Sequence, residues 1–390
     1  MKSMQYTNIG LVRLVVIQPT TFCNLDCDYC YLPNRQSKLQ MSLDLLEPIF
    51  KNLFHSQLID QEFTVIWHAG EPLSMPIAFY HAAFQNINKL NQAFNQNRCT
   101  IYQSIQTNGT LINQAWCDLF KSYQVRIGIS LDGLDFIHDA YRKTRKGLGT
   151  HASTMRGLSL LKANNIDFRV IAVLTQDSLD YPEEMFNFFM ENDIRKVGFN
   201  IDEKIGFHES SSFENRGIEE RYRDFMQRFY ELVKSTNWYL KIREFEELKH
   251  KICYGMPNEI KGQFTPFSII SIDYQGDFST FSPELLSMKS SIYGDFILGN
   301  VEHDTFESAY KTDKFKRINH DIQAGVDLCQ HTCPYFSVCG GGSPANKYFE
   351  NGLFESSETM YCKYTTKILT DIILDDIETY LVLDQPKING

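Results

Sequence analysis

The sequence lacks any apolar run that approaches the about 18 residues of a transmembrane helix. Its first 23 residues lack the long apolar core and the small-residue cleavage site of a secretory signal. It also has no basic run, and its formal net charge is −10. That argues against nucleic acid as the main partner, because phosphate backbones are bound by clustered Lys and Arg. We therefore expect a cytoplasmic protein that binds neither membranes nor nucleic acid.

The ten cysteines come with no sign of export, and in a reducing compartment thiols bind metals or carry out redox chemistry. Three of them, Cys23, Cys27 and Cys30, lie within eight residues, directly after a strand-like run. A structural zinc site uses four ligands, and a disulfide framework uses an even number of cysteines. Three thiols at the end of a strand therefore suggest a metal centre that leaves one coordination position open for a substrate.

The hydrophobic pattern alternates between strand-like and helix-like segments up to about residue 240. The strand-like segments are residues 11–18, 63–70, 99–109, 125–133, 167–175 and 196–202. Each is followed by a helix-like segment, and these are residues 42–55, with Ser42 as N-cap, 76–90, 113–123, 150–165, 181–193 and 216–234. Six such units predict an α/β fold with a parallel sheet, as an open partial (β/α)6 barrel. Ligand chemistry is then expected at the C-terminal ends of the strands.

The pattern changes after residue 240, where we expect a domain boundary. Residues 267–282 alternate about a Gly-containing turn and predict a hairpin. Residues 329–362 are rich in Cys and Gly and are predicted to be irregular, and residues 365–381 predict a closing amphipathic helix. The expected divisions are an N-terminal extension (1–10), the partial barrel (11–240) and a cysteine-rich domain (241–390).

The cysteine loop resembles that of the radical S-adenosylmethionine (SAM) superfamily. Its C-x3-C-x2-C spacing matches the loop that, in this family, holds a 4Fe-4S cluster by three irons and leaves the fourth iron to chelate SAM. The resemblance implies that Cys23, Cys27 and Cys30 bind this radical SAM cluster. It also implies that Tyr29, which precedes the last cysteine, contacts the cofactor.

Two further segments are similar to cofactor-binding motifs of the family. Residues 68–72, HAGEP, match its GGEP motif with Ala in place of the first Gly, which implies that the backbone around Gly70 and Glu71 meets the SAM amino group. Ser130 and Arg142 match positions that bind the ribose and the carboxylate of SAM in related enzymes, and a guanidinium binds a carboxylate through two hydrogen bonds. A surface ion pair is the alternative for Arg142.

Polar residues near other strand ends are predicted to face the barrel lumen, since alternate residues of a strand share one face. Further predicted SAM contacts are Gln106, Asn108 and Asn200, although such residues also satisfy loop backbone. A general base is not identified by any motif. The candidates are Asp132, Asp202 and Asp273, with a structural role as the alternative for each.

A second cysteine group resembles the SPASM extension of peptide-modifying radical SAM enzymes. That extension holds two auxiliary 4Fe-4S clusters, and the positions of one set are present here as Cys329, Cys333, Cys339 and Cys362. The other set is interrupted, because Phe281 and Ser343 stand at expected cysteine positions. We therefore expect one auxiliary 4Fe-4S cluster, with a zinc knuckle as the alternative. The remaining thiols, predicted to be buried and structural, are Cys99, Cys117 and Cys253.

The finer resemblance is to cyclophane-forming radical SAM/SPASM peptide maturases of the GrrM/OscB type, in residues 276–286, 339–352 and 358–362. It implies an enzyme that joins an aromatic ring carbon to the Cβ of a nearby residue in a ribosomal precursor peptide. The implied partners are that peptide and a low-potential electron donor of the flavodoxin or ferredoxin class. The alternatives are another SPASM-type modification, such as thioether crosslinking or sulfatase formylglycine maturation, and a non-catalytic metal-binding scaffold.

The segment before the first strand bears on how a precursor would be recognised. Relatives often carry an N-terminal winged helix that binds the leader peptide, and the about ten residues before the first strand are too few for one. We expect the leader to bind the barrel and SPASM surface or another protein.

Overall fold

The computed structural model describes residues 10–95, 99–255 and 262–383. In this part of the chain one large sheet has the strand order β12-β9-β8-β1-β2-β3-β4-β5-β6-β7. Neighbouring strands from β8 to β7 are parallel, whereas β9 is antiparallel to both β8 and β12. The first seven strands are β1 (Leu14–Ile17), β2 (Glu62–Trp67), β3 (Thr100–Thr107), β4 (Arg126–Ser130), β5 (Phe168–Leu174), β6 (Lys196–Ile201) and β7 (Lys241–Ile242).

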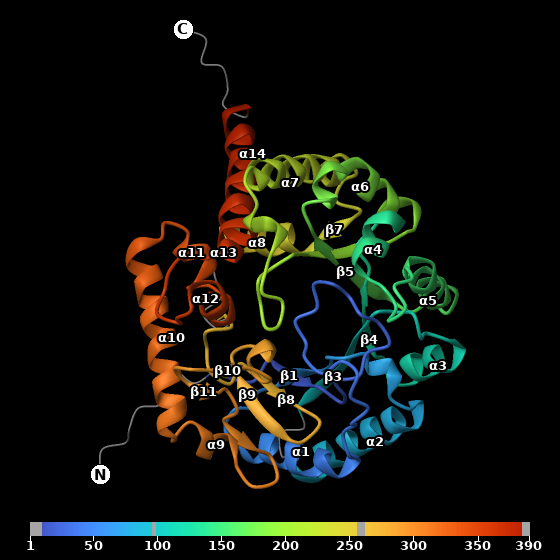
Figure 1. The fold of residues 1–390 in the computed structure, drawn as a ribbon, viewed down its shortest axis with the longest axis vertical. Coiled ribbons are helices and arrows are strands. Elements are labelled where there is room, and N and C mark those ends of the chain that lie inside the picture. The colour runs from blue at the N-terminus through green and yellow to red at the C-terminus, as the bar shows by residue number, and fades with distance from the viewer. Residues whose placement is uncertain (1–9, 96–98, 256–261, 384–390) are drawn as a thin grey trace.

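Helices follow β1 to β6 along the chain and lie outside the strands, which line the inside of an open ring (Figure 1). They are α1 (Leu46–His55), α2 (Ile77–Phe94), α3 (Gln114–Ser122), α4 (Asp135–Tyr141), α5 (His151–Ala163), α6 (Pro182–Glu191) and α7 (Ile218–Ser235). The predicted six-unit α/β partial barrel is confirmed. Sequence patterning did not identify α4 or α8 (Arg243–Tyr254), which lie between or after the predicted units.

Local sequence explains how these elements form. The predicted N-cap at Ser42 is confirmed, because its side chain accepts a hydrogen bond from the Asp44 N–H (3.2 Å) at the short turn that leads into α1. Val15, Val16 and Ile17 of β1 are all buried, as expected for a parallel strand covered on both faces. Their side chains anchor the strand end from which the cysteine loop departs.

The predicted hairpin is confirmed as β8 (Ile269–Ile272) and β9 (Asp277–Thr280). It continues the barrel sheet, because Leu14 of β1 is opposite Thr64 of β2 on one side and Ile269 of β8 on the other. The sheet therefore extends across the boundary proposed near residue 240, and the division into 11–240 and 241–390 stays a prediction. Residues 1–9 of the predicted extension lie outside the described residues.

The cysteine-rich segment is largely helical, so the prediction of an irregular 329–362 was wrong. After β10 (Lys289–Ser290), β11 (Gly294–Asp295) and β12 (Gly299–Asn300) come α9 (Phe306–Ala309), α10 (Asp313–Thr332), α11 (Phe336–Cys339), α12 (Pro344–Asn351) and α13 (Met360–Cys362). Two of the short helices are begun by side-chain caps, from Ser343 and Thr359. These short helices contain too few residues to show a helical hydrophobic period in the sequence.

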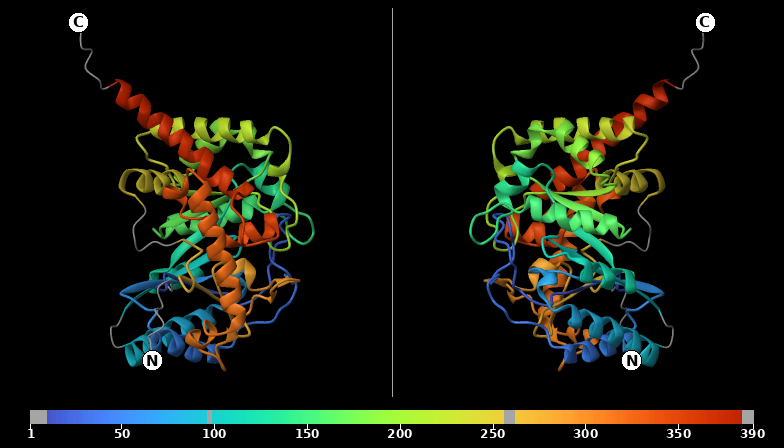
Figure 2. Two further views of the ribbon diagram at one scale, coloured as in Figure 1. Left: turned by 90° about the vertical axis from the view of Figure 1, so that its left-hand side faces the viewer. Right: turned by 90° about the vertical axis from the view of Figure 1, so that its right-hand side faces the viewer.

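The closing helix is confirmed as α14 (Leu369–Leu383), which continues from a π-helical turn, Lys363–Ile368, directly after Cys362. Figure 1 shows α11 and α12 between the two ends of the sheet, and the side views show α14 extending away from the body (Figure 2). No helix in the described ranges is both long enough and apolar enough to cross a membrane.

Candidate functional site

The loop that carries the first three cysteines is held by backbone hydrogen bonds at the C-terminal end of β1. The Cys23 N–H donates to the Arg35 carbonyl (3.0 Å), and the Asp26 N–H donates to the Lys143 carbonyl (2.8 Å). The Arg145 guanidinium donates to the Cys23 carbonyl (2.8 Å). The loop is therefore fixed both to its own far end and to the segment that follows α4.

The three thiols of this loop lie close enough to influence one another electrostatically. Burial raises the pKa of Cys23 to about 12 and that of Cys27 to about 11, and the charges of the neighbouring cysteines add to both shifts. The three thiols can lose their protons together only if a cation balances the resulting charge. A bound metal displaces the protons and supplies that positive charge. This donor set, of three cysteines on one loop, fits an iron–sulfur cluster, whose ligands are Cys thiolates.

The donors do not converge on one point. Within the described ranges no three His, Cys, Asp or Glu side chains are gathered closely enough to hold a single metal ion. A cluster requires no such convergence, because each thiolate binds its own iron.

The HAGEP segment forms a tight turn that joins β2 to the cysteine loop. Ala69 and Gly70 have φ values of +76° and +57°, and a Cβ on Gly70 would lie 2.4 Å from the Phe22 carbonyl oxygen. The Glu71 N–H donates to that same carbonyl (2.7 Å). Only glycine fits at residue 70, because a side chain there would displace the start of the cysteine loop.

The Glu71 side chain is used within the protein. Its carboxylate accepts hydrogen bonds from the Thr107 hydroxyl (2.6 Å), the Asn108 N–H (2.9 Å) and the Leu73 N–H (2.9 Å). It is 1% exposed. Glu71 therefore locks the turn after β2 to the end of β3, which leaves the backbone of the turn as the part that can meet a ligand.

Asp132 and Arg142 form a buried ion pair. The Arg142 Nε and Nη2 donate to the two Asp132 oxygens (2.8 and 3.0 Å), and the Val173 N–H and the Tyr29 hydroxyl also donate to this carboxylate. Burial alone would raise the pKa of Asp132, but Arg142 outweighs it and holds the pKa below its ordinary value.

This arrangement disfavours two predicted roles. Asp132 is stabilised as an anion with several donors, so it is a poor proton acceptor, and its role as general base is not supported by the geometry. Arg142 Nε and Nη2 are both bound to the carboxylate of Asp132, so these two groups are not free to bind the carboxylate of SAM. The alternative of an ion pair is confirmed for Arg142, but the pair is buried and not at the surface, because Arg142 is 7% exposed and Asp132 1%.

The other predicted cofactor residues fall into two places. Gln106 donates through Nε2 to the Ser130 hydroxyl (3.0 Å), and Asn108 Nδ2 donates to the Asn24 side chain (2.9 Å) beside the cysteine loop. Asn200 instead accepts from Arg243 Nη2 (2.8 Å). The structure therefore brings Gln106, Asn108 and Ser130 to the predicted site and turns Asn200 toward α8.

The two remaining base candidates have structural contacts. Asp202 accepts from His208 Nε2 (2.8 Å) and from the Ser212 hydroxyl (2.7 Å) and N–H (2.8 Å). Asp273 accepts from the Gln275 and Asp277 N–H groups (2.8 and 3.1 Å) and caps the hairpin turn. Burial raises the pKa of Asp273 to about 6. Asp273 also lines a cavity of about 950 Å3 that reaches Cys30.

Sequence analysis missed a pair of carboxyl groups near Cys30. Glu203 follows β6 and accepts only from Asn346 Nδ2 (2.6 Å) among the described residues. The side chain of Glu284, in the turn Pro283–Leu285, has only its own backbone N–H as a partner there. Burial raises the pKa of Glu203 to about 8 and that of Glu284 to about 7, and the charge of Glu284 adds to the shift at Glu203.

Tyr31 places this pair beside the cysteine loop. Burial raises the pKa of Tyr31, and the charges of Glu284, Cys30 and Glu203 add to the shift, so all three groups are near enough to act on this side chain. That hydroxyl is 3.2 Å from His68 Nε2. Two signals in the sequence could have indicated the pair: the DE dipeptide at the end of the sixth strand and the SPEL run that carries the maturase resemblance.

The second cysteine group is assembled by α10, α11 and α13. The Cys333 N–H donates to the Cys329 carbonyl (2.8 Å), and Cys339 acts electrostatically on Cys362. The ammonium of Lys347, a residue 3% exposed, lies 3.3 Å from Cys329 Sγ and donates to the Gly325 carbonyl (2.7 Å). A buried cation needs a negative partner, so this contact fits a thiolate that serves as a metal ligand.

The two interrupted cysteine positions have structural roles. Phe281 is buried and stacks on Phe315, with ring centroids 6.4 Å apart and planes 8° apart, whereas Ser343 accepts from the Asn346 N–H (3.4 Å) as the N-cap of α12. Neither position retains a metal ligand.

Of the remaining thiols, two are placed as predicted. Cys99 and Cys117 are buried, but Cys253 is exposed. The prediction that Cys253 is buried was wrong because its helix, α8, turns this residue toward solvent.

Comparison with known proteins gives a consistent result. The family described as the Radical SAM superfamily matches residues 17–189. An uncharacterized protein of Synechocystis sp. is 47% identical over 98% of this chain and 96% of its own length. A cysteine-type anaerobic sulfatase-maturating enzyme of Clostridium novyi is 25% identical over 90% of this chain and 92% of its own length.

Two solved structures share the fold. Native anSMEcpe with bound AdoMet and Cp18Cys peptide has a TM-score of 0.74 and 20% identity, covering 95% of this chain and 99% of that chain. Streptococcus suis SuiB bound to its precursor peptide SuiA has a TM-score of 0.60 and 16% identity, covering 91% of this chain and 76% of that chain.

Proposed function

Because this chain belongs to the radical SAM superfamily and is related to anaerobic sulfatase-maturating enzymes, we propose that it oxidatively modifies a ribosomally made precursor peptide. The product we propose is a cyclophane, in which an aromatic ring carbon is joined to the Cβ of a residue two positions later. The observation that carries this proposal is the second cysteine group, in which one ligand set is complete while Phe281 and Ser343 occupy the other.

The residues for the first cofactor are the three loop cysteines and the turn after β2. Cys23, Cys27 and Cys30 would hold the radical SAM cluster, and the backbone at Gly70 would meet SAM. When bound, the cluster and SAM supply the radical that removes a hydrogen atom from an unactivated carbon. The protein must exclude water and hold the target carbon close to that radical, within roughly 3–3.5 Å.

The second group supports an oxidative reaction. Removing one hydrogen atom and forming a carbon–carbon bond leaves one electron and one proton still to be taken from the peptide. Cys329, Cys333, Cys339 and Cys362 would hold one auxiliary 4Fe-4S cluster with every ligand position filled by the protein. Such a site is suited to electron transfer and closed to direct binding of the substrate.

The remaining proton requires an acceptor at the C-terminal end of the strands. We assign this role to the pair Glu203 and Glu284, because both carboxyl groups act on Tyr31, next to Cys30, and neither forms an ion pair with another described residue. A base is most effective when its pKa is near the working pH, and burial brings both groups into that range. Asn346 orients Glu203 from α12.

The experiment uses the anaerobically reconstituted protein, SAM, a reductant and the peptide encoded by the small open reading frame beside the gene. We expect a mass loss of two hydrogens per ring, which fragmentation should place within a triplet that begins with an aromatic residue. SAM cleavage with an unchanged peptide mass would refute the cyclophane assignment.

Sulfatase maturation is the second candidate, because the relatives that span most of this chain include enzymes named for it. It would convert a Cys or Ser side chain of a sulfatase peptide to formylglycine. The absent cysteines at residues 281 and 343 count against it, since sulfatase-maturing enzymes resemble the complete SPASM pattern. A sulfatase-derived peptide in the same assay separates the two reactions.

A further inference from the structure

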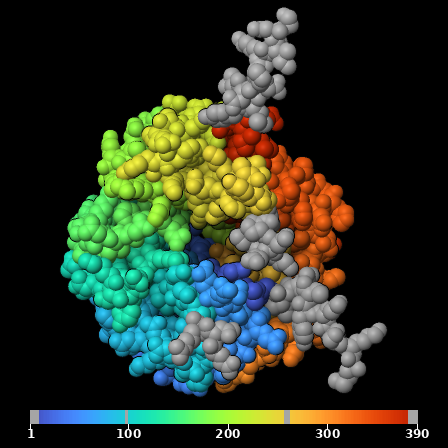
Figure 3. Space-filling model, turned by 180° about the vertical axis from the view of Figure 1, so that it is seen from behind, coloured from blue at the N-terminus to red at the C-terminus, as the bar shows by residue number. Residues whose placement is uncertain are grey.

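The opposite end of the barrel, where the strands begin, contains a cavity of about 1050 Å3. Its walls come from the first residues of β4 to β7 together with parts of β1, β2 and β3. It opens in the hollow at the centre of the face drawn in Figure 3. Most of it lies away from the cysteine loops, which are at the C-terminal ends of the same strands, and it reaches toward them as far as Gln106 of β3.

The cavity is strongly basic. Seven Lys and Arg residues line it against two acidic residues, in a chain whose net charge is −10. Some of this charge is balanced locally: Lys196 pairs with Asp167 (2.5 Å), and Arg243 Nε pairs with Glu244 (2.7 Å). The planar face of Arg126 lies over the Tyr102 ring, 3.7 Å from its centroid. An excess of positive charge remains.

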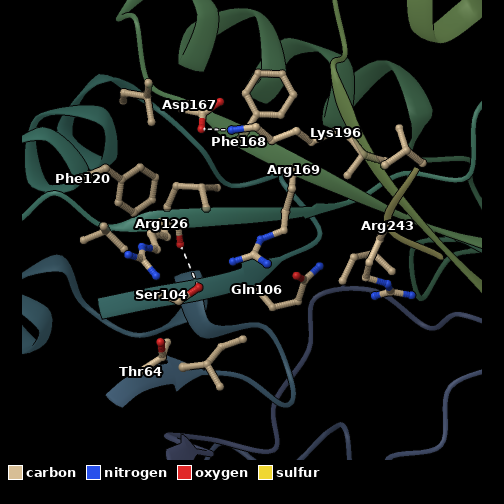
Figure 4. Close-up of a pocket in the computed structure, with 18 of the residues that line it drawn as sticks. Thr64, Ser104, Gln106, Phe120, Arg126, Asp167, Phe168, Arg169, Lys196 and Arg243 are labelled. Carbon is tan, nitrogen blue, oxygen red and sulfur yellow. Dashed lines mark hydrogen bonds and ion pairs between the residues drawn. The ribbon is translucent and has the colours of Figure 1, made fainter. Parts of the chain in front are cut away.

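Arg169 carries the uncompensated charge. Figure 4 shows its side chain extending into the middle of the cavity, between Arg126 and Arg243 and toward Gln106. It makes no hydrogen bond or ion pair within the described part of the chain. Burial lowers the pKa of Arg169, and the like charges of Arg126 and Arg243 lower it further, while the charge of Asp167 opposes the shift. Arg169 is therefore closer to cations than its single nearby carboxylate can balance.

Three guanidinium groups around one space suit a specific kind of ligand. Each presents several N–H donors in a plane and binds carboxylate or phosphate oxygens in pairs. The volume of the cavity is that of a small-molecule site. Part of its lining is apolar and comes from Phe120, Ile127 and Val170. At the inner end, the Gln106 side chain and the Ser104 hydroxyl supply neutral polar groups.

We propose that this cavity is a binding site for a small organic anion that carries carboxylate or phosphate groups, with Arg126 and Arg169 as its binding residues and Arg243, which is already held by Glu244 and Asn200, at its edge. The site has a direct connection to the reaction end of the barrel. The Gln106 amide that lies in the cavity also donates to Ser130 at the end of β4. A ligand that reaches Gln106 therefore contacts a side chain shared with the predicted cofactor site.

The test is calorimetric titration of the reconstituted protein at constant ionic strength, with pyrophosphate and citrate as the two probes. Saturable binding of one anion per chain is expected, at least tenfold weaker in Arg169→Gln. Preference for pyrophosphate identifies a phosphate ligand, and preference for citrate identifies a carboxylate. The charge-matched control is Arg216→Gln, because Arg216 is exposed and lies outside the cavity. It should bind as the wild type does.

Thermal unfolding supplies a second measurement that does not depend on the affinity of either probe. Without an anion, Arg169→Gln should melt no lower than the wild type, because the substitution removes repulsion between like charges. With saturating pyrophosphate or citrate, the wild type should gain more in melting temperature than the variant, since a ligand stabilises the state that binds it. Equal affinities for wild type and Arg169→Gln, or no saturable binding by the wild type, would overturn the proposal.

Discussion

At the scale of single residues, the carboxylate of Asp132 shows how burial and pairing divide acidic side chains between structural and chemical roles. Asp132 is 1% exposed, and its oxygens accept from Arg142, Tyr29 and the Val173 N–H. Glu203 and Glu284 are only partly buried and have no ion-pair partner among the described residues, so burial moves their pKa values in the opposite direction, upward. The presence or absence of one guanidinium decides which carboxyl group can take up a proton.

Asp132→Asn should lower the free energy of unfolding by about 3–5 kcal/mol, because it leaves the Arg142 charge buried without its partner. Anaerobic denaturant unfolding measures this change. Glu209→Gln, at an exposed position, should change the free energy by less than about 0.5 kcal/mol. A stable Asp132→Asn protein that cleaves SAM but forms no product would instead restore Asp132 as the base.

Substitution of the carboxyl pair should separate the two halves of the reaction. Glu203→Gln and Glu284→Gln should retain SAM cleavage and lose most of the crosslinked product, because only proton removal is affected. Product and deoxyadenosine are quantified in the same assay by mass spectrometry. Asp202→Asn is the neighbouring control, since the Asp202 carboxylate accepts hydrogen bonds from His208 and Ser212. Unchanged product yield in both Glu variants would exclude the pair.

The pair also predicts a pH dependence of stability. In the folded state the pKa of Glu203 is raised from 4.5 to about 8 and that of Glu284 to about 7. Between pH 4.5 and 8 the folded protein therefore holds more protons than the unfolded chain, and stability falls as the pH rises. Melting temperatures measured across this range should decline, and the decline should be smaller in the double Gln variant. Identical slopes would show that the two groups titrate normally.

At the scale of elements, the turn after β2 fixes where the cysteine loop begins. Ala69 and Gly70 both have positive φ, a conformation that costs a side-chain-bearing residue about 1–2 kcal/mol. Ala69 tolerates it in a buried position, but at Gly70 the surrounding backbone leaves no room for a Cβ. The turn therefore connects the packing of β2 to the position of Cys23.

Gly70→Ala should reduce iron binding at the first cluster, because a Cβ at 2.4 Å from the Phe22 carbonyl oxygen must push the loop away from the turn. Iron analysis after reconstitution should give less than the about eight irons expected for two 4Fe-4S clusters. Ala69→Gly, at the adjacent residue, should keep full iron content and melt no lower than the wild type. Equal iron content in both variants would contradict this account of the turn.

At the scale of the whole molecule, the parallel pairing of β8 with β1 makes the cysteine-rich segment part of the barrel sheet. The same long-range packing brings Asn346 of α12 to Glu203 after β6 and places Glu284 near Cys30. The proposed proton acceptors are thus built from parts of the chain that are about 80 residues apart. Neither the barrel nor the C-terminal segment provides this pair by itself.

Two sets of cysteine substitutions should separate the metal centres. Replacing Cys23, Cys27 and Cys30 with Ala should remove about four irons per chain and abolish SAM cleavage. Replacing Cys329, Cys333 and Cys339 should also remove about four irons but leave SAM cleavage measurable. Iron analysis and deoxyadenosine release give both readouts. Zinc in place of the second four irons would support the zinc-knuckle alternative.

The sequence by itself determined the six strand–helix units, the hairpin, the closing helix and both cysteine groups, because hydrophobic period and residue spacing are local properties. The tertiary structure alone decided that Asp132 and Arg142 bind each other, that Cys253 is exposed, and that Glu203 and Glu284 both act on Tyr31, next to Cys30. The like charges of Arg126 and Arg243, which act on Arg169, likewise come from parts of the chain distant in sequence. The protonation and availability of a side chain depend on which groups surround it in space, and no local pattern encodes those neighbours.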